Sequence, residues 1–227
     1  WAAGDIMARG FLLGGTAGRT TLAGEGLQHQ DGHSHHLAYS VPSIHAYDPA
    51  YAYELAVIIQ EGVRRMFVKQ EDIIYYLTVM NEFYKMPPMP EGSEEGILKG
   101  IYKFKPSENK RKKYKAHLFG SGSILNEAIE AQKILENDFG IAADVWSVTS
   151  YKELYVDAID AERENLRNFD NEERKPYITE VLQNENGIFV AASDYLKSLP
   201  ASIAKWVPGP MAVLGTDGFG RSESRQA

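Results

Sequence analysis

The sequence contains no cysteine and no apolar run long enough to cross a membrane. Without cysteine the protein can form no disulfide, no thiolate metal site and no cysteine nucleophile. The longest apolar runs, such as residues 73–80, are far shorter than the ~20 residues that a membrane-spanning helix needs. Both absences favour a cytoplasmic protein that does not insert into a membrane.

Positive charge is also in short supply, with 24 Lys and Arg against 31 Asp and Glu and a formal net charge of -7. This balance disfavours a dedicated binder of nucleic acid or anionic lipid. The 227 residues, 44% of them hydrophobic, are enough for one large or two ordinary domains with a buried core. Because the chain opens at Trp1 without a signal peptide, we expect it to be a piece of a longer protein.

Apolar periodicity divides most of the chain into alternating strands and helices. Residues 10–43 are the exception and are expected to be mostly loop. Asp48 as N-cap and Pro49 at the first helical position predict a helix that extends to about residue 67. The other predicted elements are strands at 43–47, 73–80, 115–119, 143–148, 188–192 and 211–214, helices at 123–138, 152–168, 178–183 and 195–206, and a helix start at 222–225. This order predicts an α/β fold with a mostly parallel sheet.

A proline-rich stretch at 86–92 predicts a domain boundary, because proline fixes φ and lacks a backbone donor. The following residues 99–115 hold eight Lys or Arg and one Glu. Such a run is more often a solvated linker than a nucleic-acid patch. We therefore expect one unit at 1–95, a basic linker at 96–114 and a second unit at 115–227.

The first loop is the main candidate for chemistry because it gathers four of the six histidines. They are His29, His33, His35 and His36, and Glu25 lies four residues before the first of them. Imidazole gains and loses a proton near pH 7, so this segment is suited to acid/base work or substrate binding. A solvated polar loop is the more common explanation of such a composition. A metal site is the least favoured, because the spacing matches no known zinc pattern.

Two glycine-rich turns are weaker candidates. Residues 120–123 (GSGS) join a predicted strand to a predicted helix and could hold a phosphate, although a tight turn with Ser121 or Ser123 capping the helix is the commoner use. Residues 216–221 suggest an ordered loop in which Asp217 and Arg221 pair. Neither turn matches a complete dinucleotide, P-loop or serine-hydrolase motif.

Several segments together resemble one family, the homodimeric type of the pyruvate dehydrogenase E1 component, a thiamine-diphosphate enzyme related to transketolase. Gln30 and His36 depart from the pattern of this family. The matching segments are WAAGD, ARGFLLGGTAGRTTLAGEGLQHQDGHSH, YDPAYAYELAVI, NEFYKMPPMPEGSEEGILKGIYKF, GSGSIL, DVWSVTS and VLGTDGFGRSESR. They cover most of the chain in the expected order.

The resemblance implies that residues 1–95 end a pyrimidine-binding domain and that residues 115–227 form a truncated transketolase C-terminal-like domain. The family's Gly-Asp-Gly metal and diphosphate motif is missing, as is the glutamate that activates the aminopyrimidine. Thiamine diphosphate and Mg²⁺ are thus expected in the full-length enzyme, with no cofactor or metal bound by this chain alone. Glu25 and His29 remain from the active site, where they would orient substrate and the cofactor-bound intermediate.

In the intact enzyme this resemblance implies decarboxylation of pyruvate, transfer of the acetyl group to the lipoyl group of the E2 acetyltransferase, and a homodimer. The isolated chain is expected to be inactive. Two alternatives stay open: a transketolase-type enzyme, and a stand-alone α/β ligand-binding or interaction module whose histidine-rich loop is the binding surface.

Overall fold

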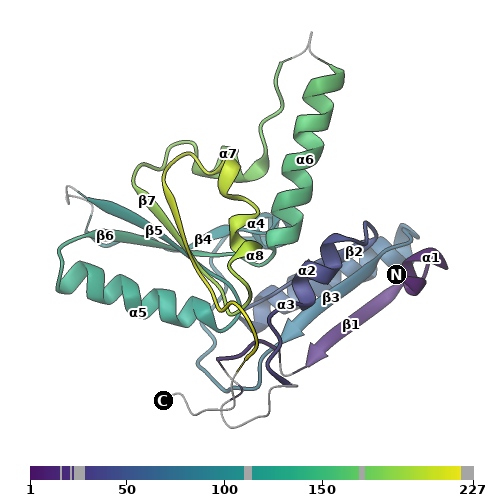
Figure 1. Cartoon of the computed structure of the whole chain (residues 1–227), viewed down its shortest axis with the longest axis horizontal. Coiled ribbons are helices and arrows are strands. Elements are labelled where there is room, and N and C mark those ends of the chain that lie inside the picture. The colour runs from purple at the N-terminus through teal and green to yellow at the C-terminus, as the bar shows by residue number, and fades with distance from the viewer. Residues whose placement is uncertain (16, 21, 23–28, 110–113, 169–171, 221–227) are drawn as a thin grey trace.

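The computed structural model describes residues 1–15, 17–20, 22, 29–109, 114–168 and 172–220 and contains two β-sheets built from successive parts of the chain (Figure 1). The first sheet has the strand order β1-β3-β2, and the second has the order β4-β6-β5-β7-β8. None of the helices in the described ranges has the length and apolar character needed to cross a bilayer. The predicted helix start at 222–225 lies outside the described residues.

The first sheet is parallel, with β1 (Gly10–Gly15) and β2 (Ile44–Tyr47) on either side of β3 (Ile74–Val79). Alternate residues of β3 face opposite sides. Tyr75 and Leu77 are fully buried beneath α3 (Ala52–Val63), whereas Tyr76 contacts α2 (Ser34–Tyr39) through His35. The two helices therefore cover opposite faces of this sheet (Figure 1). A short helix, α1 (Ala2–Asp5), precedes β1.

Residues 10–43, expected to be mostly loop, contain two regular elements, β1 and α2. The expectation for the following helix is wrong. The helix after Asp48 begins only at Ala52, and the Glu54 carboxylate accepts the Tyr51 amide at 3.1 Å at its start. Asp48 is buried and caps no helix. The helix changes to π geometry over Arg64–Val68 (η2).

The second sheet contains four parallel strands, β5 (Lys115–Gly120), β6 (Ala142–Ser147), β7 (Ile188–Ala192) and β8 (Met211–Leu214). Along β5, Ala116 and Leu118 pack under α5 (Ile124–Asn137), and Phe119 packs on the opposite face. That face is covered by α6 (Tyr151–Arg167), α7 (Tyr177–Leu182) and α8 (Ser198–Ala201). The predicted α/β class and mostly parallel sheet are confirmed.

The structure differs from the predicted linker at 96–114. Helix α4 (Glu94–Lys99) leads into β4 (Tyr102–Lys105), which pairs antiparallel with β6 at the sheet edge. Residues 110–113 of the basic run lie outside the described residues. The division into 1–95, 96–114 and 115–227 stays a prediction, with β4 belonging to the second sheet.

The predicted helix at 195–206 is also interrupted. Tyr195 is not helical, because its carbonyl accepts the Thr216 amide at 3.0 Å. Helix α8 contains Pro200, which has no amide to donate, and a 3-10 turn (Ala204–Trp206, η3) follows. Only two short helical pieces form over this range.

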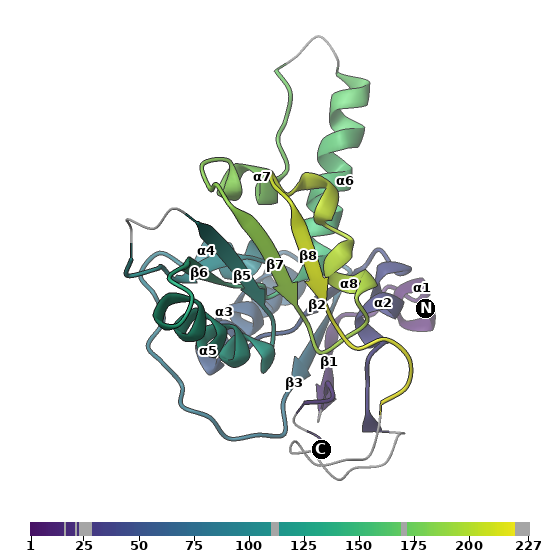
Figure 2. The same cartoon turned by 60° about the vertical axis from the view of Figure 1, so that its left-hand side comes forward.

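The carboxyl ends of the two sheets meet at one junction (Figures 1 and 2). Asp48 follows β2, and its amide donates to the Thr149 carbonyl after β6 at 2.7 Å. Its own carbonyl accepts the Gly122 amide after β5 at 3.0 Å. Ligands of parallel α/β folds bind at such carboxyl ends, so this junction is where a site is expected.

Candidate functional site

The histidine loop is defined here as residues 18–33, of which the described residues 18–20, 22 and 29–33 lie beside the junction between the sheets. His29 is described and exposed, and Glu25 lies outside the described residues. At the end of the loop, Asp31 accepts the amides of His33 and Ser34, both at 3.0 Å. Burial alone would raise the pKa of Asp31, but hydrogen bonds from Ser34 and His33 hold it below its usual value. An ionised Asp31 thus fixes the start of α2.

The other three histidines of the predicted cluster point to different surroundings. His33 is exposed, and the His36 ring lies 2.7 Å from Ser198 Oγ. His35 is buried, with Nε2 at 3.2 Å from Thr78 Oγ1. Because their contacts diverge, these three rings do not form a metal site in the described structure.

His35 begins a buried hydrogen-bond chain that ends at Asp48. Thr78 donates its hydroxyl proton to Asp48 Oδ1 at 2.6 Å, so His35 Nε2 carries the proton donated to Thr78. Tyr195, which follows β7 of the second sheet, donates to the same oxygen at 3.4 Å. The other oxygen, Asp48 Oδ2, is buried as well. The chain joins α2, both sheets and a buried carboxyl group.

Burial makes both ends of this chain neutral near pH 6. It lowers the pKa of His35 to about 4 and raises the pKa of Asp48 to about 7. Removing the carboxylate from water favours its protonated form, and Asp194 nearby adds to this effect. The buried junction therefore carries less charge than its residue types suggest.

Replacing Asp48 by asparagine should flatten the pH dependence of stability. Since the folded state holds the Asp48 proton more tightly than the unfolded state, the free energy of unfolding falls as the pH rises from about 4 to about 7. Asp48→Asn removes about 1–4 kcal/mol of this decline. Urea unfolding of both chains between pH 5 and pH 8 measures the difference. Curves that stay parallel over this range would contradict the raised pKa.

Two residues that fix the histidine loop were missed by the sequence analysis. Asp194 accepts the amides of Arg19 at 2.7 Å and Thr20 at 2.9 Å, and the Arg19 guanidinium donates to two carbonyls of the segment after β8. A signal did exist for Asp194, because it follows the predicted strand at 188–192, where carboxyl ends of parallel strands collect functional groups. Arg19 carried no such signal.

The two glycine-rich turns have structural roles in the described residues. Ser123 precedes α5 but its side chain makes no capping bond, so the predicted cap is wrong. The hydroxyls of Ser121 and Ser123 are buried beside the junction, and the Ser121 hydroxyl acts on the pKa of Asp48, which it lowers against the larger effect of burial. Asp217 accepts the Lys197 amide at 3.1 Å, and its predicted partner Arg221 lies outside the described residues.

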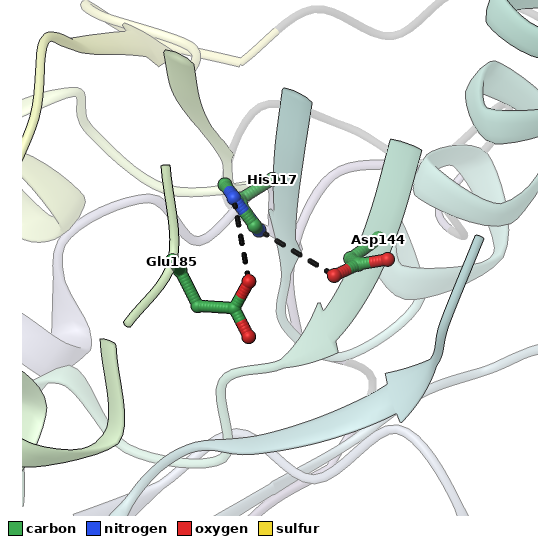
Figure 3. A group of neighbouring side chains, drawn as sticks. All are labelled: His117, Asp144 and Glu185. Carbon is green, nitrogen blue, oxygen red and sulfur yellow. Dashed lines mark ion pairs between the residues drawn. The ribbon is translucent and has the colours of Figure 1, made fainter. Parts of the chain in front are cut away.

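A second cluster of polar side chains lies at the opposite end of the second sheet. His117 stands between Glu185 and Asp144, with ring nitrogens 3.8 Å from each carboxylate (Figure 3). Lys115 pairs with Asp144 at 2.9 Å and with Glu185 at 2.8 Å, and Lys103 contacts the same two carboxylates. Two ammonium groups thus balance two carboxylates.

This cluster has the chemistry of an ion-pair network. His117 Nε2 lies 3.2 Å from the Asn186 carbonyl and Nδ1 accepts the Trp146 indole proton at 3.3 Å, so both ring nitrogens are occupied. Burial lowers the pKa of His117, which favours the neutral ring. A metal ion would have to displace both lysines and break these bonds. The cluster connects the amino-terminal ends of β5 and β6 to the segment that precedes β7.

Comparison with known families divides the chain in two. Residues 1–87 match the pyruvate dehydrogenase E1 component middle domain, and residues 100–227 match the transketolase-like TK C-terminal domain. The chain is 55% identical over 227 residues to the pyruvate dehydrogenase E1 component of Pseudomonas aeruginosa, covering 100% of the chain and 26% of that protein. The protein of the same name from Escherichia coli K12 is 53% identical over 228 residues, covering 100% and 25%.

Solved structures share the fold at low sequence identity. Transketolase from Campylobacter jejuni aligns with a TM-score of 0.64 and 19% identity, covering 94% of this chain and 28% of its own. A split-gene transketolase described as an inactive β4 tetramer aligns with a TM-score of 0.60 and 19% identity, covering 92% and 58%. These matches confirm the transketolase-like fold expected of the second unit.

The chain spans about a quarter of the length of the curated relatives it matches. The predicted family is nevertheless confirmed, because the identity extends over the whole chain and both family models match in the expected order. The chain belongs to the pyruvate dehydrogenase E1 component family, with a transketolase-like C-terminal domain as its second part.

Proposed function

We propose that this chain is part of a pyruvate dehydrogenase E1 component that decarboxylates pyruvate and passes the acetyl group to the lipoyl group of E2. The observation that supports this most strongly is the 55% identity over 227 residues to a protein of that name. The transketolase alternative rests on structures with 17–19% identity, which support a common fold alone. Release of CO₂ from pyruvate by the parent protein, the longer protein of which this chain is proposed to be a part, tests the proposal. A ketose phosphate serves as the competing substrate.

The described residues do not fit the diphosphate and metal site of thiamine diphosphate and Mg²⁺. The buried cations Arg19 and Lys152 both donate to backbone carbonyls, Lys152 to those of Ala38 and Val41 at 2.7 and 2.8 Å. The carboxylates of the ion-pair network are neutralised by lysines. We therefore assign the cofactor, which supplies the electron sink for decarboxylation, to the remainder of the parent protein.

Glu25 and His29 are proposed as the catalytic residues that this chain contributes. His29 is exposed on a loop at the carboxyl ends of both sheets, where it can reach a ligand held by another part of the protein. A neutral imidazole can donate a hydrogen bond to a carbonyl or carboxylate oxygen of the substrate, and an imidazole ring can take up or release a proton near pH 7. Its role is to orient pyruvate and to hold a proton beside it.

The remaining features of the proposal concern the parent protein in the cell. We propose a homodimer in the cytoplasm whose partner is the lipoylated E2 acetyltransferase. The formal net charge of -7 supports an assignment without nucleic acid or membrane partners.

The isolated chain should bind no thiamine diphosphate. Because the buried cations Arg19 and Lys152 and the carboxylates of the ion-pair network are already paired with groups of the protein, titration of the 227-residue chain with thiamine diphosphate and Mg²⁺ should release no saturable heat in the micromolar range. The parent protein serves as the positive control. Saturable micromolar binding by the isolated chain would contradict the assignment of the cofactor site to the rest of the protein.

A further inference from the structure

Both ends of the histidine loop are attached to residues 194–196, the short segment that follows β7 of the second sheet. At the start of the loop, Asp194 accepts the amides of Arg19 and Thr20 and the Thr20 hydroxyl at 2.7–2.9 Å. At its end, the Gly32 carbonyl accepts the Leu196 amide at 3.2 Å. The loop is therefore closed at its base, directly after β7.

The Arg19 side chain fills the base of this closed loop. It is 8% exposed, and its guanidinium donates to the carbonyls of Thr216 and Gly218, both at 2.7 Å. Gly32 lies against the same group, since a Cβ atom on this residue would overlap the guanidinium. The two donors point in fixed directions, an arrangement that lysine cannot reproduce.

The acceptors of Arg19 are themselves fixed in place. The Thr216 amide donates to the Tyr195 carbonyl at 3.0 Å, and Asp217 accepts the Lys197 amide at 3.1 Å. The segment at 216–218 is thus held against the residues that follow β7. Arg19 connects this rigid segment to both ends of the loop.

His29 lies at the described end of the loop, next to these contacts. Its carbonyl accepts the Asp31 amide at 3.0 Å. The neighbouring Gln30 is buried, and its side-chain amide donates to the Leu22 carbonyl at 2.9 Å. His29 is exposed beside them, so its position is set by the groups that hold the base.

We propose that Arg19 is a positioning residue for the reaction proposed above, acting through the histidine loop by fixing its base against the 216–218 segment. The expected change in kcat rests on the proposed function, whereas the structural role of Arg19 at the base of the loop does not. Arg19 is buried and bonded to carbonyls, so it acts on substrate through His29 and touches none itself. A misplacement of about 1 Å in a catalytic group can cost about 10²-fold in rate.

The kinetic test uses the parent protein with Arg19→Met, Arg19→Lys and, as a matched control, Lys197→Met, which removes an exposed cation beside the same segment. Arg19→Met should lower kcat for pyruvate by about 10–100-fold with a smaller change in KM, because positioning acts in the transition state. Arg19→Lys should recover little of this loss, and Lys197→Met should change kcat less than twofold. A KM increase at unchanged kcat would overturn the proposal.

A double variant that carries both Arg19→Met and His29→Ala distinguishes a positioning role of Arg19 from a general loss of stability. If Arg19 acts through His29, adding Arg19→Met to His29→Ala should lower kcat by no more than about threefold further. If the kcat of the double variant instead falls by the product of the two single losses, the proposal is overturned. Arg19→Lys retains the buried charge and permits the same comparison if the methionine variant does not fold.

Hydrogen exchange tests the inference independently of the proposed reaction. Amides of residues 19–34 should exchange faster in Arg19→Met, whereas those of β5 and α5 should keep the rates of the unmodified parent. Unchanged exchange in the loop would overturn the role of Arg19 at its base. Absence of pyruvate turnover in the unmodified parent would instead contradict the proposed function.

Discussion

Replacing His29 by alanine in the parent enzyme should lower its turnover of pyruvate by about 10²–10⁴-fold, the usual contribution of a positioned acid/base group. His29 is exposed at the junction of the two sheets, so its removal should leave the fold intact. Steady-state kinetics measure the loss, and a thermal melt of the variant checks that the structure is preserved.

His33→Ala is the matched control for this substitution. His33 is also exposed, but its amide donates to Asp31 at the start of α2, which places it in the support of the loop. We expect a smaller kinetic loss. Full activity of His29→Ala would remove His29 from the mechanism, and equal losses with release of a bound metal would favour a metal site.

Glu54→Ala should destabilise the 227-residue chain by about 3–5 kcal/mol, among the largest effects of a single substitution. The Glu54 carboxylate is fully buried and accepts four hydrogen bonds, each of which would leave a buried donor unsatisfied if lost. The donors are the amides of Ala50 and Tyr51 and the hydroxyls of Tyr102 and Ser147, at 2.5, 3.1, 2.6 and 2.6 Å. Tyr102 and Ser147 belong to the second sheet, so both parts of the chain lose stability together.

Glu61→Ala provides the control for this effect on the same helix. Glu61 pairs with Arg64 three residues later, and a pair of this type contributes about 0–1 kcal/mol. Urea denaturation of the three chains gives the differences in unfolding free energy. A loss below about 1 kcal/mol for Glu54→Ala would show that Glu54 does not join the two sheets energetically.

Elements with a clear apolar period were predictable from the sequence. The strand at 115–119 and the helix at 123–138 have residues of one face recurring at the expected spacing, and the structure places them at β5 and α5. Strand β1 was missed because three of its six residues are glycine, which gives no apolar pattern. Its pairing with the strongly apolar β3 supplies the stability that its own sequence lacks.

The candidate site was predictable only in part, because residues far apart in the sequence come together to form it. The histidine loop is visible in the sequence because its residue types are unusual over a short range. Its attachment is not visible, because Arg19 and Asp194 are separated by 175 positions. Asp48 looked like a helix cap, since aspartate before proline commonly is one. Its burial arises from contact with the second sheet, which no local pattern encodes.

Transfer of the acetyl group from pyruvate to the lipoyl group of E2 is the measurement that tests the proposed function most directly. The parent protein should acetylate a lipoylated E2 domain when pyruvate, thiamine diphosphate and Mg²⁺ are supplied, and His29→Ala should slow this reaction. Transfer of a two-carbon unit between sugar phosphates, with no acetylation of the lipoyl domain, would contradict the proposal and favour a transketolase-type enzyme.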